Sequence, residues 1–156
     1  MQVRFAQPKE APLIYQFICD KAKFDRSFGT CSATVQTTIE KIQGTIFSDR
    51  PVAYVLLAED ERDKVGFALY YLRYSSFLGQ GSIWLDDLFV NRDLRNKGAG
   101  TLLMTKLRQV AKDNNYSHIA WTANARNISG LRFYQRLGAE ISEQKGDRCL
   151  LNWNLS

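Results

Sequence analysis

The sequence has a single histidine, His118, and three cysteines among its 156 residues. One histidine at the start of a predicted strand favours neither a metal site nor a Ser-His-Asp triad. Cys19, Cys31 and Cys149 are odd in number and widely spaced, so they predict neither a disulfide framework nor a zinc site. We therefore expect no bound metal. Without a partner base, no cysteine is favoured as a covalent acyl carrier.

Long apolar segments are also lacking. No apolar run approaches the roughly 20 residues that span a bilayer, and the first residues lack the apolar segment of a secretory signal. Only three prolines occur, none of them in a spacer, and there are no repeats or low-complexity tracts. These absences predict one domain over residues 1–156, located in the cytoplasm and without a membrane partner.

The charge of the chain is moderately positive. A formal net charge of +5 suits nucleic acid or a phosphorylated cofactor, and it is also compatible with a solvated basic surface. The basic residues are scattered, with no dense lysine and arginine block and no clustered basic and aromatic face. We therefore expect no nucleic-acid partner.

The pattern of apolar residues predicts a mixed α/β sheet. Strands are predicted at 2–6, 52–60, 65–74, 82–90 and 117–123, with two more in the tail on either side of Gly146 and Asp147. Helices are predicted at 11–24, 34–47 and 127–139, and residues 95–115 are predicted to be a glycine turn that opens a helix. Consecutive strands favour antiparallel pairing, and the strand–helix–strand unit at 82–123 predicts one parallel pair through a crossover.

A glycine turn follows the predicted strand at 82–90. It reads Arg95, Asn96, Lys97, Gly98, Ala99, Gly100, and a helix begins there. A helix start offers unpaired N–H groups and a positive dipole end, and glycines allow close approach, so the turn suits a pyrophosphate. It is neither a dinucleotide fingerprint, which needs glycine or alanine where Leu103 stands, nor a P-loop, because Lys97 precedes the glycines. The alternative is a tight turn without a ligand.

Two adjacent carboxylates interrupt the apolar strand IWLDDLFV. Burying a carboxylate is costly unless it has a partner. One interpretation is a site for a cationic amine, with one carboxylate as a base acting through water; the other is a pair satisfied by backbone N–H groups or an arginine. Alternation predicts Asp86 on one face with Trp84 and Leu88, and Asp87 on the other with Ile83, Leu85 and Phe89.

These segments together resemble the GNAT acetyltransferases. VGFALYYLRYSSFLGQGSIWLDDLFV, then RNKGAG, then the N-x₆-Y spacing of Asn127 and Tyr134 is similar to the diamine/polyamine (spermidine/spermine) and thialysine acetyltransferase branch. The resemblance implies a GNAT-like fold, a central, mostly antiparallel sheet with helices on both faces, and acetyl-CoA as cosubstrate. It also implies a homodimer. The apolar final strand, CLLNWNL, either pairs across subunits or closes the sheet within one chain.

The resemblance also implies roles for individual residues. Backbone amides of 96–101 would hold the coenzyme A pyrophosphate, and the strand edge at 88–90 would pair with the pantetheine arm. Tyr134 would stand near the thioester sulfur. The cofactor-binding set is then Leu88, Phe89, Val90, Arg95, Asn96, Lys97, Gly98, Ala99, Gly100, Thr101, Asn127 and Tyr134.

The expected catalytic groups are Tyr134, Asp86 and Asp87. A tyrosine with an ordinary pKa near 10 is protonated at neutral pH and could protonate the leaving thiolate; the alternative is a packed tyrosine with a solvated hydroxyl. The branch usually has glutamate in place of Asp86, so the shorter aspartate favours a water relay. It often has tryptophan where Arg126 stands.

We therefore predict an N-acetyltransferase that moves an acetyl group from acetyl-CoA to a small primary amine, of polyamine, diamine or lysine-like type. Direct attack in a ternary complex is expected, because positioning supplies much of the rate in such reactions. The alternatives are a protein or peptide N-acetyltransferase and a non-catalytic module that binds acyl-CoA.

Overall fold

Seven strands form one sheet across the residues described by the computed structural model, which are 1–29 and 34–155. Cys31 lies outside them. The sheet order is β1-β2-β3-β4-β5-β7-β6. The strands are β1 (Gln2–Phe5), β2 (Tyr54–Glu59), β3 (Lys64–Ser75), β4 (Gln80–Val90), β5 (His118–Asn124), β6 (Glu140–Lys145) and β7 (Arg148–Asn154).

The pairing confirms the predicted mixed sheet. All neighbours are antiparallel except β4 and β5, which are parallel and joined through a helix. The final strand β7 lies between β5 and β6 of the same chain, so in this structure it closes the sheet internally.

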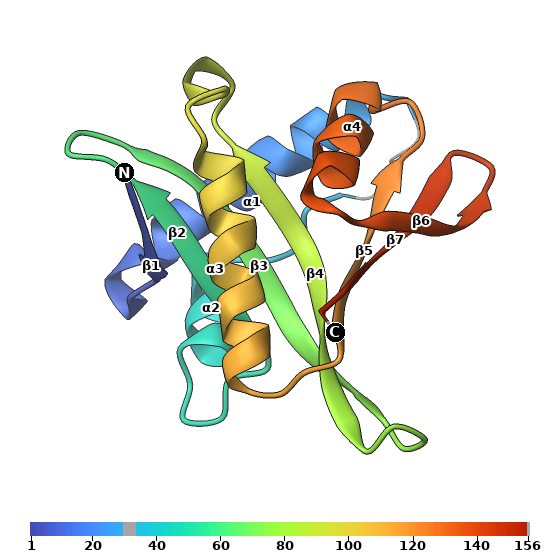
Figure 1. Ribbon diagram of the computed structural model, residues 1–156. Coiled ribbons are helices and arrows are strands. Elements are labelled where there is room, and N and C mark those ends of the chain that lie inside the picture. The colour runs from blue at the N-terminus through green and yellow to red at the C-terminus, as the bar shows by residue number, and fades with distance from the viewer. Residues whose placement is uncertain (30–33, 156) are drawn as a thin grey trace.

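Helices cover both faces of this sheet (Figure 1). They are α1 (Ala11–Arg26), α2 (Ile39–Ile46), α3 (Ala99–Asp113) and α4 (Ile128–Leu137). Ile14 and Phe17 of α1 pack with α2 on one face, whereas Leu103 and Leu107 of α3 pack with α4 residues on the other. No helix in the described part of the chain is both long and apolar enough to cross a membrane.

The start of α2 differs from the prediction of a helix beginning at residue 34. The helix begins after Thr38, whose side-chain oxygen accepts a hydrogen bond from the Lys41 N–H at 3.1 Å. A threonine cap satisfies a backbone donor that the first turn leaves unpaired, and the capped start excludes the residues before it from the helix.

A β-bulge in β4 overturns the predicted alternation. Leu69 of β3 pairs with Asp87 and Tyr70 pairs with Leu85, which leaves Asp86 as an extra residue. One extra residue reverses the faces of everything beyond it. Ile83 and Leu85 therefore belong to the core beneath α3, whereas Phe89 belongs to the core beneath α1, although all three were predicted on one face.

The same bulge lies where β4 and β5 separate. Within the described residues their parallel pairing is limited to Ile83 with Ile119 and Trp84 with Ala120. Beyond these pairs the two strands diverge toward α4 (Figure 1). The carboxyl-terminal half of β4 thus has one edge bonded to β3 and the other edge open.

Candidate functional site

The first turn of α3 presents unpaired backbone donors. Gly98 caps the helix with a positive φ of 86°, a conformation that a side chain disfavours. The first hydrogen bond of the helix runs from the Leu102 N–H to the Gly98 carbonyl at 3.0 Å. The N–H groups of residues 99–101 therefore have no partner within the helix, and the positive end of the helix dipole lies beside them.

These donors line a pocket of about 430 Å³, which we call the groove. Its lining confirms that the turn and the end of β4 lie together, and it adds residues from α1 and α4. The lining residues are Phe24, Leu88, Phe89, Val90, Arg95, Asn96, Gly98, Ala99, Gly100, Thr101, Asn127, Ser129, Gly130, Phe133 and Arg136. Lys97 is exposed and does not line the groove. Tyr134 lines a smaller space beside the groove, which is described below.

Gly100 has a packing role that the sequence did not indicate. A Cβ atom at this position would stand 3.2 Å from Cζ of Phe133. The absence of a side chain therefore allows α4 to pack closely against the first turn of α3. Gly98, in contrast, has open space around its missing Cβ and is required for its backbone conformation.

Arg95, a member of the expected cofactor-binding set, is held by contacts within the protein. Its Nε donates to the Val90 carbonyl at 3.1 Å, and its guanidinium lies over the Phe24 ring at 4.7 Å from the centroid. Arg95 therefore ties the end of β4 to α1. Arg136 on α4 lines the groove and is exposed, so among the described lining residues it is the cation available to a ligand; no motif in the sequence distinguished it.

The open edge of β4 presents backbone groups to the groove. The Asn91 N–H bonds the Val65 carbonyl at 2.8 Å, so by alternation the N–H and C=O groups of Leu88 and Val90 point away from β3. The Val90 carbonyl is used by Arg95. Leu88 is thus the residue on this edge best placed to pair with an extended ligand.

A small space of about 60 Å³, which we call the channel, adjoins the groove. Phe24, Leu88 and Asn127 line both spaces. Tyr134 lies in the channel, with its ring edge-on to Trp121 at a centroid separation of 5.1 Å. Burial raises the pKa of Tyr134 to about 12, so its phenol keeps its proton at neutral pH.

Asn127 joins the groove to α4. Its Oδ1 accepts a hydrogen bond from the Gly130 N–H at 3.1 Å, which caps the helix that carries Tyr134. The close contact leaves no room for a side chain at Gly130, where a Cβ would lie 2.4 Å from the Asn127 Nδ2. In the N-x₆-Y spacing, Asn127 is therefore the cap of the helix, and Tyr134 lies two turns further along the same helix.

A wider cavity of about 490 Å³, which we call the chamber, lies on the other side of the channel. Lys21, Asp25 and Asp86 line both, so groove, channel and chamber adjoin one another in that order through shared lining residues. The chamber is lined by Lys21, Asp25, Asp86, Thr122, Ala123, Asn124, Lys145, Asp147 and Arg148.

The two adjacent carboxylates have different environments. Asp86, at the bulge, is exposed and lines the chamber, so the expectation that it is buried was wrong. Asp87 is partly buried, and its Oδ1 lies 3.3 Å from Nζ of Lys21. Lys21 also contacts Asp25 at 2.6 Å. The partner of Asp87 is therefore a lysine from α1, whereas we had considered an arginine or backbone donors.

The ion pair shifts both pKa values. Burial raises the pKa of Asp87, and the nearby Lys21 ammonium limits that rise. Burial alone would lower the pKa of Lys21, but the charges of Asp87 and Asp25 outweigh it and the pKa is raised. Lys21 is therefore a fixed cation at the junction of channel and chamber.

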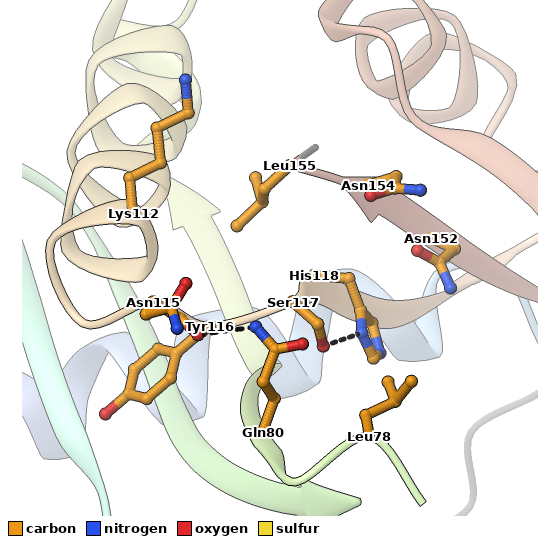
Figure 2. A pocket seen from close by; sticks show the side chains of 10 residues that line it. All are labelled: Leu78, Gln80, Lys112, Asn115, Tyr116, Ser117, His118, Asn152, Asn154 and Leu155. Carbon is orange, nitrogen blue, oxygen red and sulfur yellow. Dashed lines mark hydrogen bonds between the residues drawn. The ribbon is translucent and has the colours of Figure 1, made fainter.

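A further cavity of about 480 Å³ lies at the other end of β5, beside His118 (Figure 2). The Ser117 Oγ is 2.8 Å from the His118 Nδ1, but none of the described side chains lining this cavity is a carboxylate that could complete a triad. Burial lowers the pKa of His118. Among the described residues, no group of three or more His, Cys, Asp or Glu side chains could hold a metal ion.

A mixed sheet that opens between two parallel strands, with a helix amino terminus facing the opening, defines a domain that binds a phosphorylated, extended coenzyme. The chain belongs to the acetyltransferase (GNAT) family, whose model matches residues 17–139. It is an acetyl-CoA-dependent N-acetyltransferase.

Relatives and solved structures agree with this assignment. A thialysine N-epsilon-acetyltransferase of Bos taurus is 27% identical over 158 residues, covering 96% of this chain and 90% of that protein. An L-ornithine N5-acetyltransferase of Arabidopsis thaliana is 22% identical, covering 92% and 81%. The PaiA N-acetyltransferase of Thermoplasma acidophilum in complex with coenzyme A has a TM-score of 0.72 at 13% identity, covering 99% of each chain, and shares the fold.

Proposed function

We propose that this enzyme acetylates the primary amine of a small molecule by direct attack of the amine on acetyl-CoA within a ternary complex. The observation that carries this proposal is that groove, channel and chamber adjoin one another through shared lining residues. Acetyl-CoA would lie in the groove with its pyrophosphate at the start of α3 and its thioester at the channel. The acceptor would enter from the chamber.

The acceptor must lose a proton before it can attack. A lysine-like amine has a pKa near 10.4, so reaching the neutral form at neutral pH costs about 4.6 kcal/mol. Of the described carboxylates that line the channel and the chamber, Asp86 is the one without an ion pair, and it lines both spaces. We assign it the attraction of the ammonium and the acceptance of its proton through water. Asp87 instead holds Lys21 in place.

Collapse of the tetrahedral intermediate releases the coenzyme A thiolate, which must be protonated. Tyr134 lies in the channel and keeps its proton because burial raises its pKa to about 12. We assign it the donation of that proton, or of a hydrogen bond, to the leaving sulfur. The Leu88 N–H, on the open edge of β4, is the donor that we place on the thioester carbonyl oxygen.

A small acceptor is favoured over a protein by the size of these spaces. The chamber measures about 490 Å³ and the adjoining channel at Tyr134 only about 60 Å³, which suits an amine at the end of a thin chain. The thialysine and ornithine enzymes among the relatives carry names of small amines, which supports the same class. A peptide acceptor is the second candidate.

The experiment is release of thiol from acetyl-CoA over a panel of amines: spermidine, spermine, putrescine, lysine, thialysine, ornithine and a basic peptide. We expect turnover with at least one small amine and loss of about 10²–10⁴-fold in kcat for Tyr134→Phe, with unchanged affinity for acetyl-CoA. The matched control is Tyr74→Phe, because Tyr74 is 74% exposed on β3. Turnover of the peptide alone would overturn the proposal of a small acceptor.

We also propose a homodimer. Because β7 is paired on both sides within the chain, the sheet edges available to a second copy are β1 and β6. Light scattering of the purified protein tests this proposal, and a monomer mass over the micromolar range would reject it.

A further inference from the structure

The chamber carries charges of both signs, and most of them are already paired within the protein. The pairs are Lys21 with Asp25 and Asp87, Lys145 with Glu143, and Asp147 with Arg126. In the described part of the chain, the lining residues Asp86 and Arg148 are the two charged side chains that make neither an ion pair nor a side-chain hydrogen bond. The chamber therefore offers one available anion and one available cation.

These two residues lie at different depths. Asp86 lies on the bulge of β4 and lines both the channel and the chamber, so it is close to the place of reaction. Arg148 is the first residue of β7, opposite Asn124, and it lines the chamber but not the channel. It therefore lies farther from the place of reaction than Asp86. Strand β5 lies between the strands that carry them (Figure 1). A ligand that spans both residues extends from the channel to the outer side of the chamber.

We propose that the acceptor is a carboxylate-bearing amine of the diamino acid class, whose distal ammonium enters beside Asp86 and whose carboxylate binds Arg148. The inference rests on the proposed function and specifies its acceptor. A guanidinium presents a planar fork of donors that matches a carboxylate in two parallel hydrogen bonds. Arg148 is thus the specificity-determining residue of the chamber.

Lys21 strengthens this assignment. Its ammonium lies between Asp25 and Asp87, at 2.6 Å and 3.3 Å, and satisfies both carboxylates. The single ammonium cancels one of the two negative charges, so the three groups together offer a net charge of only −1 to a second ammonium of the acceptor. A polyamine would bring several positive charges into a chamber whose available groups are one carboxylate and one guanidinium, and the guanidinium would repel it.

The test compares two acceptors that differ only in the carboxylate, L-lysine and its decarboxylated counterpart 1,5-diaminopentane. For the wild-type enzyme we expect kcat/KM to favour lysine by about 10–100-fold, the size of one charged hydrogen-bonded contact. Arg148→Gln should raise the KM for lysine by a similar factor and should lower the KM for 1,5-diaminopentane, whose second ammonium the guanidinium repels. Arg148→Glu should reverse the preference.

The matched control is Arg62→Gln, since Arg62 is exposed in the turn between β2 and β3 and lies outside the chamber lining. This substitution should leave kcat and KM unchanged for both lysine and 1,5-diaminopentane. Equal kcat/KM for the two wild-type acceptors, or an equal loss for both in Arg148→Gln, would overturn the inference while leaving the proposed function intact. If acetyl-CoA binds but no small amine is acetylated, the proposed function fails and the inference falls with it.

Discussion

Lys21 Nζ lies 3.3 Å from Asp87 Oδ1, so a cation of α1 is paired with a carboxylate of β4 at the junction of channel and chamber. Both side chains are largely removed from water, with exposures of 21% and 19%. Removing one partner of such a pair leaves the other charge uncompensated, which costs more than the pair itself contributes.

Replacing Lys21 by methionine should therefore destabilise the protein by about 1–3 kcal/mol at neutral pH. The pKa of Asp87, already raised by burial, would rise further without the ammonium. A carboxyl group whose folded pKa exceeds its unfolded value opposes folding above that pKa, and the penalty disappears as it is protonated. The deficit relative to the wild type should shrink from neutral pH to about pH 5, as measured by urea unfolding.

Lys23→Met is the control for this experiment. Lys23 is exposed on the same helix, two residues away. Its replacement should change the free energy of unfolding by no more than about 0.5 kcal/mol. A Lys21→Met deficit that stays constant with pH would show that Asp87 does not titrate as described.

The pH dependence of turnover should have only a rising limb from about pH 6 to about pH 10. The rate rises because a larger fraction of the acceptor amine is neutral. No falling limb is expected in this range, because the pKa of Tyr134 is about 12 and the phenol stays protonated. Steady-state rates with saturating acetyl-CoA provide the measurement. A fall between about pH 8 and pH 10, absent in Tyr134→Phe, would mean that the phenol ionises earlier.

The two glycines of the turn should respond differently to alanine. Gly98→Ala places a side chain at a φ of +86° and should cost about 1–2 kcal/mol in stability. Gly100→Ala gains helix propensity but pushes Phe133, so we expect a stability change within about 1 kcal/mol and about tenfold weaker acetyl-CoA binding. Thermal unfolding and calorimetric titration separate the two effects.

Gly44→Ala provides the control for both glycine variants. Gly44 lies inside α2, and a Cβ atom there would have no neighbour within 4 Å. The substitution should stabilise the protein by about 0.5–1 kcal/mol and leave acetyl-CoA affinity unchanged. Unchanged coenzyme binding in Gly100→Ala would contradict the role given to the Phe133 contact.

The ion cluster that anchors β1 predicts a loss of stability in acid. Hydrogen bonds from Arg4, Lys64 and Gln2 lower the pKa of Glu59 from 4.5 to about 2. A carboxylate with a depressed folded pKa stabilises the fold above its unfolded pKa, and that contribution is lost as pH falls toward the folded value. Glu59→Gln should therefore cost about 2 kcal/mol at neutral pH and progressively less from about pH 4.5 to pH 2.

Chemical unfolding at a series of pH values checks this expectation. The matched variant is Glu61→Gln, in the exposed turn that follows β2. It should be nearly neutral at every pH. Equal effects of Glu59→Gln and Glu61→Gln would show that the ion cluster around Glu59 does not cause the loss of stability in acid.

The element order and the groove could be predicted from the sequence because both depend on local patterns. Apolar periodicity identified the strands and helices, and the glycines of residues 98–100 placed a helix start after a strand. The parallel crossover followed from chain order alone.

The exposure of Asp86 and the role of Lys21 could not be predicted in the same way. A bulge depends on how β3 pairs with β4, and no single-strand pattern contains that register. Lys21 enters the channel because α1 lies across the open part of the sheet, which is a tertiary relationship. Arg136 is missed for the same reason, since the packing of α4 decides which of its basic residues faces the groove.

The extra residue in β4 gives the site a second carboxylate without disturbing the strand beyond it. Deleting the codon for Asp86 would remove the bulge and leave a regular ladder, because Leu85 and Asp87 already pair with the adjacent residues Tyr70 and Leu69. Residues 87–90 would keep their partners and faces, and Asp87 would stay beside Lys21. No substitution at position 86 could do the same, because a substitution changes one side chain and leaves the bulge in place.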